Sequence, residues 1–386
     1  MNSVIAQLSA AQDKNQLVNI YLNSGDIFYT GYVQKVNNDE LVIATYESSG
    51  LADGYVAIKT SLIEIVETSS DDLSSIEEKM AIANQVGLFE SRPTDLQFDS
   101  DINLFPQIII QAYINHEIIL IHDNDESRFY TGIVQKINNE SFDFYRLDKF
   151  NFIDNQVATM GFNQSMIIEF QGRELSVMSK VVDKVSENNI AHTAESFNNI
   201  VDILATSYHH HQLIEVRCRY NDHFFYVGEV IMLNDDGIIL KVVDMSGQFG
   251  GYVYIKMNGI ERVTIGNDYL ELVELMRQQN VDDHRIAQPV LNDSREFDST
   301  EDNMIAVLSQ SMSKKQLIRI QLKSGTSYLG YPSKILDETM KFNLLDETTT
   351  FFIYGKEIAL SDVVEIGFEY IYAYLDEQRL KANGDM

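Results

Sequence analysis

The chain has 386 residues, of which 45% are hydrophobic and 10% aromatic, a composition typical of folded globular proteins and not of disordered chains. Its 58 acidic and 29 basic residues give a formal net charge of −29, which disfavours an unselective phosphate-binding surface, since such surfaces need Lys and Arg. One cysteine, no apolar run near ~20 residues and no signal peptide at the N-terminus predict a cytoplasmic protein without disulfides or membrane helices.

One stretch of sequence recurs four times. It reads FYTGYVQKVNND at 28–39, FYTGIVQKINNE at 129–140, FYVGEVIMLNDD at 225–236 and SYLGYPSKILDE at 327–338. The glycines that mark it are Gly31, Gly132, Gly228 and Gly330, at spacings of 101, 96 and 102 residues. A period near 100 residues is the size of one small domain. We therefore predict four modules with the boundaries 1–95, 96–196, 197–296 and 297–386.

The sequence of the first module predicts a helix followed by five strands. The helix begins at Asn2 or Ser3 and ends near Lys14, with Val4, Ile5 and Leu8 on one face. Alternating or continuous apolar residues then predict strands at 17–22, 28–36, 41–46, 55–58 and 62–66. The glycine in the middle of the second strand indicates a sharp bend or a close backbone approach.

A second helix is predicted after the strands of the first module. Ser74 and Glu77 have the spacing of a capping box, and Leu73, Ile76 and Met80 recur at helical spacing. Helices with the same role are expected near 175–185, 269–276 and 368–375, and polar linkers near 91–101 and 282–300. Each module therefore has a leading helix, five strands and a trailing helix.

This pattern resembles the Sm-like (Lsm) fold, a small open five-stranded barrel of SH3-like proportions. Gly25 and Gly31 stand where the first Sm motif has its two glycines, with Val33 and Val36 at the apolar positions that follow. The aspartate of the family's loop falls on Asn37, Asn138, Asn234 and, with a shift of one residue, Asp337. The resemblance implies a mainly β fold of four tandem barrels with flanking helices.

Sm-like proteins assemble into rings in which the edge strand of one barrel pairs with that of the next. An open barrel leaves unpaired backbone groups on both edges, so four barrels in one chain can pair edges within it. Two chains could close a ring of eight barrels. A protein partner or self-association is therefore expected.

The RNA-binding residues of the family do not carry over. Its base-contacting asparagine falls on Leu41, Phe142, Ile238 and Lys341, and no copy has the Arg-Gly pair of the second motif. With the net charge, this disfavours uridine-type RNA binding at that site but leaves other faces of the molecule open.

The corner between the leading helix and the first strand carries basic or titratable residues in three copies. These are Lys14 in the first, His209, His210 and His211 in the third, and Lys314 and Lys315 in the fourth. Three adjacent histidines invite a metal site, but side chains in sequence point in different directions, so we interpret them as solvated corner residues. In a ring these residues would share one rim, the best candidate for binding nucleic acid.

No catalytic motif is present in the sequence. Cys218 lies in a predicted strand without a histidine partner, and there is no Walker loop, nucleophile elbow, dinucleotide fingerprint or zinc pattern. Asp123 to Glu126 resembles a calcium loop but lacks its glycine and distal glutamate, so a hairpin tip is expected. No cofactor and no metal are predicted.

Three functional hypotheses follow. The first is a non-enzymatic assembly or adaptor scaffold of four Sm-like barrels that can form rings. The second is an RNA- or DNA-binding regulator that uses the Lys and His residues of the corners. The third, an enzyme or small-ligand binder, requires a deep pocket with convergent polar groups.

Overall fold

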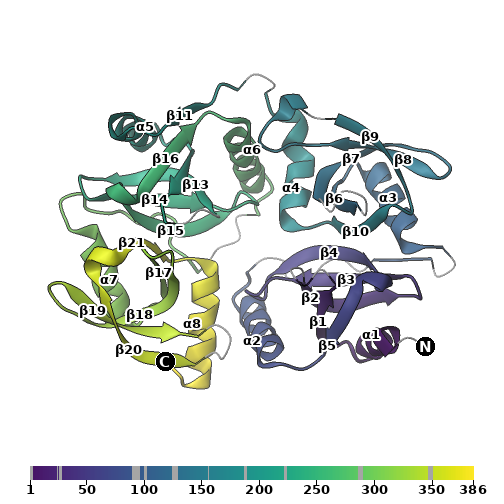
Figure 1. The fold of residues 1–386 in the computed structure, drawn as a ribbon, viewed down its shortest axis with the longest axis horizontal. Helices are drawn as coiled ribbons and strands as arrows, with labels where there is room; N and C mark the ends of the chain where they lie inside the picture. The colour runs from purple at the N-terminus through teal and green to yellow at the C-terminus, as the bar shows by residue number, and fades with distance from the viewer. Residues whose placement is uncertain are drawn as a thin grey trace. The chain divides into compact units, whose positions relative to one another are not determined.

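The structure is a computed structural model, and it describes residues 3–386 with the exception of 24, 26–27, 89–95, 100–101, 124–128, 155, 187–188, 221–223, 286–289 and 347–350. The chain divides into two compact units, Met1–Glu187 (unit 1) and Asn188–Met386 (unit 2). The fold is mainly β with flanking helices, as predicted, and each unit contains one large antiparallel sheet (Figure 1). No helix of the described residues is long and apolar enough to cross a membrane.

Each unit contains two groups of five strands with helices before and after them. Unit 1 has α1 (Ser3–Lys14), β1 (Leu17–Leu22), β2 (Phe28–Val36), β3 (Glu40–Tyr46), β4 (Ala52–Lys59), β5 (Ile63–Glu67), α2 (Asp71–Gln85), α3 (Leu104–Asn115), β6 (Ile118–Asp123), β7 (Phe129–Ile137), β8 (Ser141–Arg146), β9 (Gln156–Gly161), β10 (Ser165–Phe170) and α4 (Arg173–Val181). Unit 2 has β11 (His192–Ala194), α5 (Phe197–His210), β12 (Ile214–Cys218), β13 (Phe225–Leu233), β14 (Gly237–Val243), β15 (Phe249–Lys256), β16 (Ile260–Ile265), α6 (Asp268–Asp282), α7 (Asn303–Lys314), β17 (Ile318–Leu322), β18 (Ser327–Ile335), β19 (Thr339–Leu345), β20 (Phe352–Ala359), β21 (Val363–Phe368) and α8 (Ile371–Asn383).

The strand order repeats from group to group. We call β1–β5, β6–β10, β12–β16 and β17–β21 groups 1 to 4. In unit 1 the order is β5-β1-β2-β3-β4-β10-β6-β7-β8-β9, so the fifth strand of each group returns beside its first strand. Unit 2 has the same order, with β11 added outside β16. A meander whose last strand rejoins its first strand needs a strong bend along the sheet.

Four separate hydrophobic clusters lie inside these groups, one mainly in each. Every cluster includes buried residues of the leading helix, namely Leu8 in α1, Phe105 in α3, Leu204 in α5 and Leu308 in α7. The leading helix of each group therefore covers the apolar interior that its own strands form, and burial of this apolar surface is the main stabilising term.

The four glycines of the recurring stretch lie in the same surroundings. A Cβ atom on Gly31, Gly132, Gly228 or Gly330 would stand 2.0 to 2.4 Å from a carbonyl oxygen of the third strand of its group. Any side chain there would force the second and third strands apart. The recurring glycine therefore lies where the backbones of the second and third strands approach each other closely in each group.

Within each unit the two groups are joined by the same edge pairing. In unit 1, β4 of group 1 pairs with β10 of group 2, and in unit 2, β15 pairs with β21. Tyr55 stacks on Phe170 with 5.4 Å between ring centroids, and Tyr252 stacks on Phe368 at 5.6 Å. We call these two pairings the junctions.

Lysines at the end of the fourth strand fasten both junctions. Lys59 Nζ donates to the carbonyl of Asn163 at 2.7 Å, and Lys256 Nζ donates to the carbonyl of Leu360 at 2.9 Å. Because strand pairing, ring stacking and the lysine contact all recur, the two junctions are one interface used twice.

A half-buried tyrosine–glutamate bond crosses each junction. Tyr29 donates from its hydroxyl to Glu169 Oε1, and Tyr226 donates to Glu365 Oε2, each at 2.8 Å. Glu169 faces Val56, whereas Glu365 faces Ile255, which is the equivalent of Ile58. The two glutamates therefore lie two positions apart along the fifth strand. Burial raises the pKa of both carboxyl groups above the usual value.

Group 1 also supplies the cap for the leading helix of group 2. Asn103 precedes α3 without a side-chain cap, and the N–H of Leu104 instead donates to Glu40 Oε2 at 2.5 Å. In unit 2 the corresponding helix α7 is capped by its own Asp302, which accepts from the N–H of Ile305 at 3.1 Å. The N-terminus of α3 is therefore capped by Glu40 of group 1 and not by the residue that precedes the helix.

Two sequence expectations are wrong in detail. The trailing helix α2 begins at Asp71, and its N-cap is Ser70, which accepts from the N–H of Leu73, so Ser74 and Glu77 lie inside the helix. The linkers are also not merely polar. Phe98 packs against the core of group 2 and Phe297 against the core of group 4, so each linker contributes to the group that follows it.

We predict that Gly31→Ala destabilises unit 1 by about 3 kcal/mol, because the new Cβ would overlap the carbonyl oxygen of Ala44. The free energy of unfolding in urea measures this. Gly161→Ala is the matched control, since its Cβ would meet nothing closer than 3.5 Å. Equal midpoints for wild type and Gly31→Ala would show that the close approach is not present.

We further predict that the protein becomes more stable as the pH falls from about 8 toward the ordinary glutamate pKa of 4.5. Burial raises the folded-state pKa of Glu40, Glu169, Glu365 and Glu377, so the folded state binds more protons than the unfolded state in this window. Their stabilising contribution is complete below the unfolded pKa and is lost as the pH rises through the folded pKa.

The measurement is the thermal midpoint as a function of pH, and each kcal/mol corresponds to about 2–4 °C for units of this size. Glu365→Gln removes one titrating group and should flatten the curve. A midpoint that rises with pH over the same range would contradict the assignment.

Candidate interaction edges and corners

The corner residues predicted from the sequence are helix terminators. Lys14 ends α1 and is followed by Asn15 with a φ of 48°, while His211 and Lys315 end α5 and α7 with φ of 54° and 51°. His116 has the same role after α3, with a φ of 55°. Residues with positive φ stop a helix, and cations there interact favourably with the helix dipole. This geometry explains why such residues recur at the corner.

All six corner residues named from the sequence are exposed. These are Lys14, His209, His210, His211, Lys314 and Lys315. They belong to three different groups, and the described residues contain no set of three or more His, Cys, Asp or Glu side chains that could hold a metal ion.

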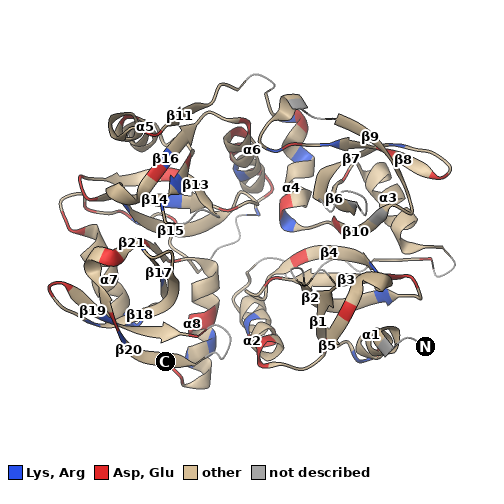
Figure 2. Ribbon diagram, viewed as in Figure 1, with Lys and Arg blue, Asp and Glu red and all other residues tan. Residues whose placement is uncertain are grey.

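The corner of group 3 also carries an acidic residue, Glu229. His211 Nδ1 lies 3.4 Å from Glu229 Oε2, and Arg277 Nη1 lies 3.3 Å from Glu229 Oε1. Glu229 therefore offsets the positive charge of Arg277 beside the histidine corner. Acidic and basic residues are scattered over the elements of both units, and neither unit presents a wholly basic element in this view (Figure 2).

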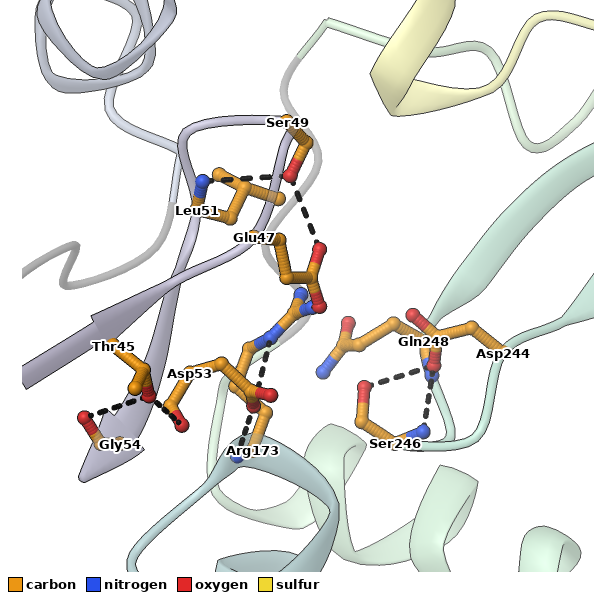
Figure 3. A network of polar contacts seen from close by, with 10 residues as sticks. All are labelled: Thr45, Glu47, Ser49, Leu51, Asp53, Gly54, Arg173, Asp244, Ser246 and Gln248. Carbon is orange, nitrogen blue, oxygen red and sulfur yellow. Dashed lines mark hydrogen bonds and ion pairs between the residues drawn. The ribbon is translucent and has the colours of Figure 1, made fainter. Parts of the chain in front are cut away.

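The loop between the third and fourth strands has the same turn in groups 1 and 3. Glu47 Oε2 accepts from the hydroxyl of Ser49 at 3.0 Å, and Asp244 Oδ1 accepts from the hydroxyl of Ser246 at 2.8 Å (Figure 3). In group 1 the longer side chain of Glu47 also pairs with Arg173 at the start of α4. The turn therefore helps to join groups 1 and 2, and it offers no reactive group.

A glycine follows each of these serines and lies close to the trailing helix. A Cβ on Gly50 would stand 2.7 Å from the N atom of Met80 in α2, and one on Gly247 would stand 2.7 Å from the N atom of Arg277 in α6. The trailing helices of groups 1 and 3 are thus packed against this turn.

The thiol of Cys218 is buried at the junction of unit 2. Burial, with the nearby carboxylate of Glu365, raises the pKa of the thiol well above its usual value. A buried neutral thiol is a poor nucleophile. Cys218 therefore contributes to packing at the junction.

Among the described residues, two fourth strands have no strand on their outer edge. They are β9 in unit 1 and β20 in unit 2, which stand at the ends of the strand orders. Their counterparts β4 and β15 are buried over most of their length by the junctions. On the open edges Val157, Ile353 and Tyr354 are 55%, 54% and 68% exposed. We call β9 and β20 the open edges.

Groups 2 and 4, which have the open edges, carry an equivalent tyrosine, and its neighbour is a cation instead of a glutamate. Tyr130 lies under the guanidinium of Arg146, 3.7 Å from the ring centroid to Cζ. The hydroxyl of Tyr328 accepts from Lys356 Nζ at 2.6 Å, and that Nζ stands 4.1 Å from the centre of the ring. Where a junction has tyrosine and carboxylate, an open edge has tyrosine and cation.

Arg146 is incompletely satisfied. Its Nε atom is buried and has no hydrogen-bond partner among the described residues. A buried donor without a partner is costly, and an acidic group added at this edge would satisfy it. Both open edges therefore have a tyrosine beside a cation.

The residues of the open edges were not identified from the sequence. Tyr29, Tyr130, Tyr226 and Tyr328 do stand at the second position of all four copies of the recurring stretch, so the repeat contained a signal. Their partners are far away along the chain, and the difference between junction and open edge exists only in the folded structure.

Comparison with known proteins adds no family. No family model matches the chain, and no curated protein matches it. Among solved structures, the PlzA protein of Borreliella burgdorferi in complex with c-di-GMP is 10% identical, covering 44% of this chain and 93% of that chain, with a TM-score of 0.08. A similarity of this size carries no argument about fold or function.

Proposed function

We propose that this protein is a non-enzymatic cytoplasmic assembly scaffold of four Sm-like barrels that binds protein strands at its open edges. The recurring glycine contact, the repeated strand order and the four separate cores support four modules of one kind. The observation that carries the function is the contrast between open and paired fourth strands. The chain already uses this edge twice to bind a strand.

Backbone hydrogen bonds would give an added strand its affinity, as in β-augmentation. The exposed apolar side chains of β9 and β20 would give it contact area, and the cations Arg146 and Lys356 would favour an acidic strand. An unprotected edge is otherwise a liability for a folded protein, so an edge with apolar residues is best explained by a partner.

The alternative is an RNA- or DNA-binding regulator that uses the corner residues. The exposure of Lys14, Lys314 and Lys315 supports it. The net charge of −29 and the pairing of His211 with Glu229 support the scaffold instead.

We predict that the scaffold selects extended acidic peptides from a displayed random library. Binding to Lys356→Glu or Arg146→Glu should be weakened by about tenfold for the peptides that use each edge, because a cation beside the tyrosine is replaced by an anion. Titration of a selected peptide by calorimetry measures this. Selection of no peptide, or of peptides without carboxylates, would contradict strand binding of this kind.

We predict only weak binding of mixed-sequence RNA, and no dependence of that binding on Lys14, Lys314 and Lys315. Filter binding at about 50 mM and about 200 mM salt tests this, since contacts to phosphate produce a steep salt dependence. The variant with all three lysines changed to alanine is the control. Tight, salt-sensitive binding that this variant abolishes would replace the scaffold by the nucleic-acid regulator.

A further inference from the structure

Two arginines face each other across the first and fifth strands of group 3. Arg217 of β12 pairs with Arg262 of β16 in the antiparallel register. The neighbouring pair in that register, Val216 and Val263, is buried in the core of the group. Because successive side chains of a strand point to opposite faces, both arginines lie on the outer face of the sheet. Like charges directly opposite each other on antiparallel strands are destabilising, and an anion between them would relieve the repulsion.

The other groups do not repeat this pair of cations. The equivalent positions hold Tyr21 and Ile65 in group 1, His122 and Ile167 in group 2, and Gln321 and Glu365 in group 4. The arginine pair is therefore a property of group 3 and not a consequence of the repeated architecture.

The guanidinium of Arg262 has no acceptor within the chain. Its Nε atom is buried without a hydrogen bond, and its side chain makes no ion pair or ring contact among the described residues. Glu261 beside it and Glu195 just beyond β11 are exposed, and the described chain shows no ion pair between either of them and Arg262. The strand β11 covers β16 only as far as Val263, which pairs with Ala194. A buried donor without an acceptor is costly, so this position is short of an anion.

Arg217 is held in place but keeps donors available. Its Nε donates to Glu215 Oε1 at 3.1 Å, and Asn267, the N-cap of α6, donates to the other oxygen of that carboxylate at 3.3 Å. Its Cζ lies 5.3 Å from the centre of the Phe225 ring. Its Nη groups make no hydrogen bond among the described residues. A guanidinium fixed in this way loses little freedom when an anion binds.

The geometry of the pair selects the kind of anion. Guanidinium groups offer planar sets of N–H donors that match the oxygens of carboxylate and phosphate. A carboxylate has two oxygens, which one guanidinium can occupy, and a phosphodiester likewise has two free oxygens. A terminal phosphate group has three acceptor oxygens and a charge of about −1.5 to −2, so it can accept from both arginines at once.

We propose that the outer face of β12 and β16 binds a terminal phosphate group between Arg217 and Arg262, either as inorganic phosphate or as a phosphorylated side chain. Neither strand is an open edge, so this site is separate from the strand-binding edges of the scaffold and does not depend on them.

The test is thermal unfolding of the full chain with millimolar inorganic phosphate at about pH 7.5, where this ion is mostly doubly charged. Sodium chloride at equal ionic strength is the reference. Phosphate should raise the midpoint of wild type, because binding to the folded state stabilises it by mass action. Arg262→Gln should abolish the rise. Arg285→Gln removes an exposed arginine of the same unit with the same change of charge, and it should behave as wild type.

A second measurement separates binding from a structural role of Arg262. Titration followed by phosphorus NMR should show affinity weakened at least about tenfold in Arg262→Gln. Without phosphate, this variant should unfold at the temperature of wild type or higher, since it removes one of two opposed like charges. A lower midpoint together with an unchanged response to phosphate would make Arg262 a structural residue only and overturn the proposal.

A peptide with one phosphoserine, its unphosphorylated form and a short RNA distinguish the sources of phosphate. Tighter binding of the phosphopeptide than of inorganic phosphate would identify a phosphorylated protein as the ligand, and the reverse order would identify the free ion. Arg262→Gln should weaken both. No binding of either probe by wild type, an equal loss in Arg285→Gln, or a preference for RNA over both probes overturns the proposal.

Discussion

The pairing of a fourth strand with the fifth strand of a neighbouring group is the interaction on which the rest of each unit depends. It turns two five-strand groups into one sheet in both units. It is fastened by stacked rings, by a lysine bound to a carbonyl and by a tyrosine–glutamate bond. Because backbone groups at an open edge must otherwise be satisfied by water, each junction removes an exposed edge from both partners.

The junctions also explain where the buried charges lie. Glu365 is buried and Glu169 is half-buried at the pairing, and each accepts a hydrogen bond from a tyrosine hydroxyl. Burying a carboxylate is costly unless hydrogen bonds compensate for lost hydration, and protonation lowers that cost. Some acidic residues of the chain therefore make hydrogen bonds at the junctions, and not all of them lie on the surface.

Much of the local structure is predictable from the sequence, while its long-range pairing is not. The predicted strands at 17–22 and 28–36 coincide with β1 and β2, because alternating apolar residues and a turn with Gly25 define them. The start of α2 was misplaced because Ser70 and Ser74 both precede acidic residues, and only the bond to Leu73 distinguishes them. The identity of the strands that meet at a junction is absent from any local pattern, since Tyr29 and Glu169 are 140 residues apart.

The short strand β11 determines which end of its sheet a partner strand could reach. It belongs to unit 2 and occupies the outer edge of β16. Among the described residues, the sheet of unit 2 therefore has β20 as its open fourth strand and no open fifth strand, whereas the sheet of unit 1 ends in β9 on one side and β5 on the other. A protein that binds strands at such edges would thus offer more room for partners on its first half than on its second.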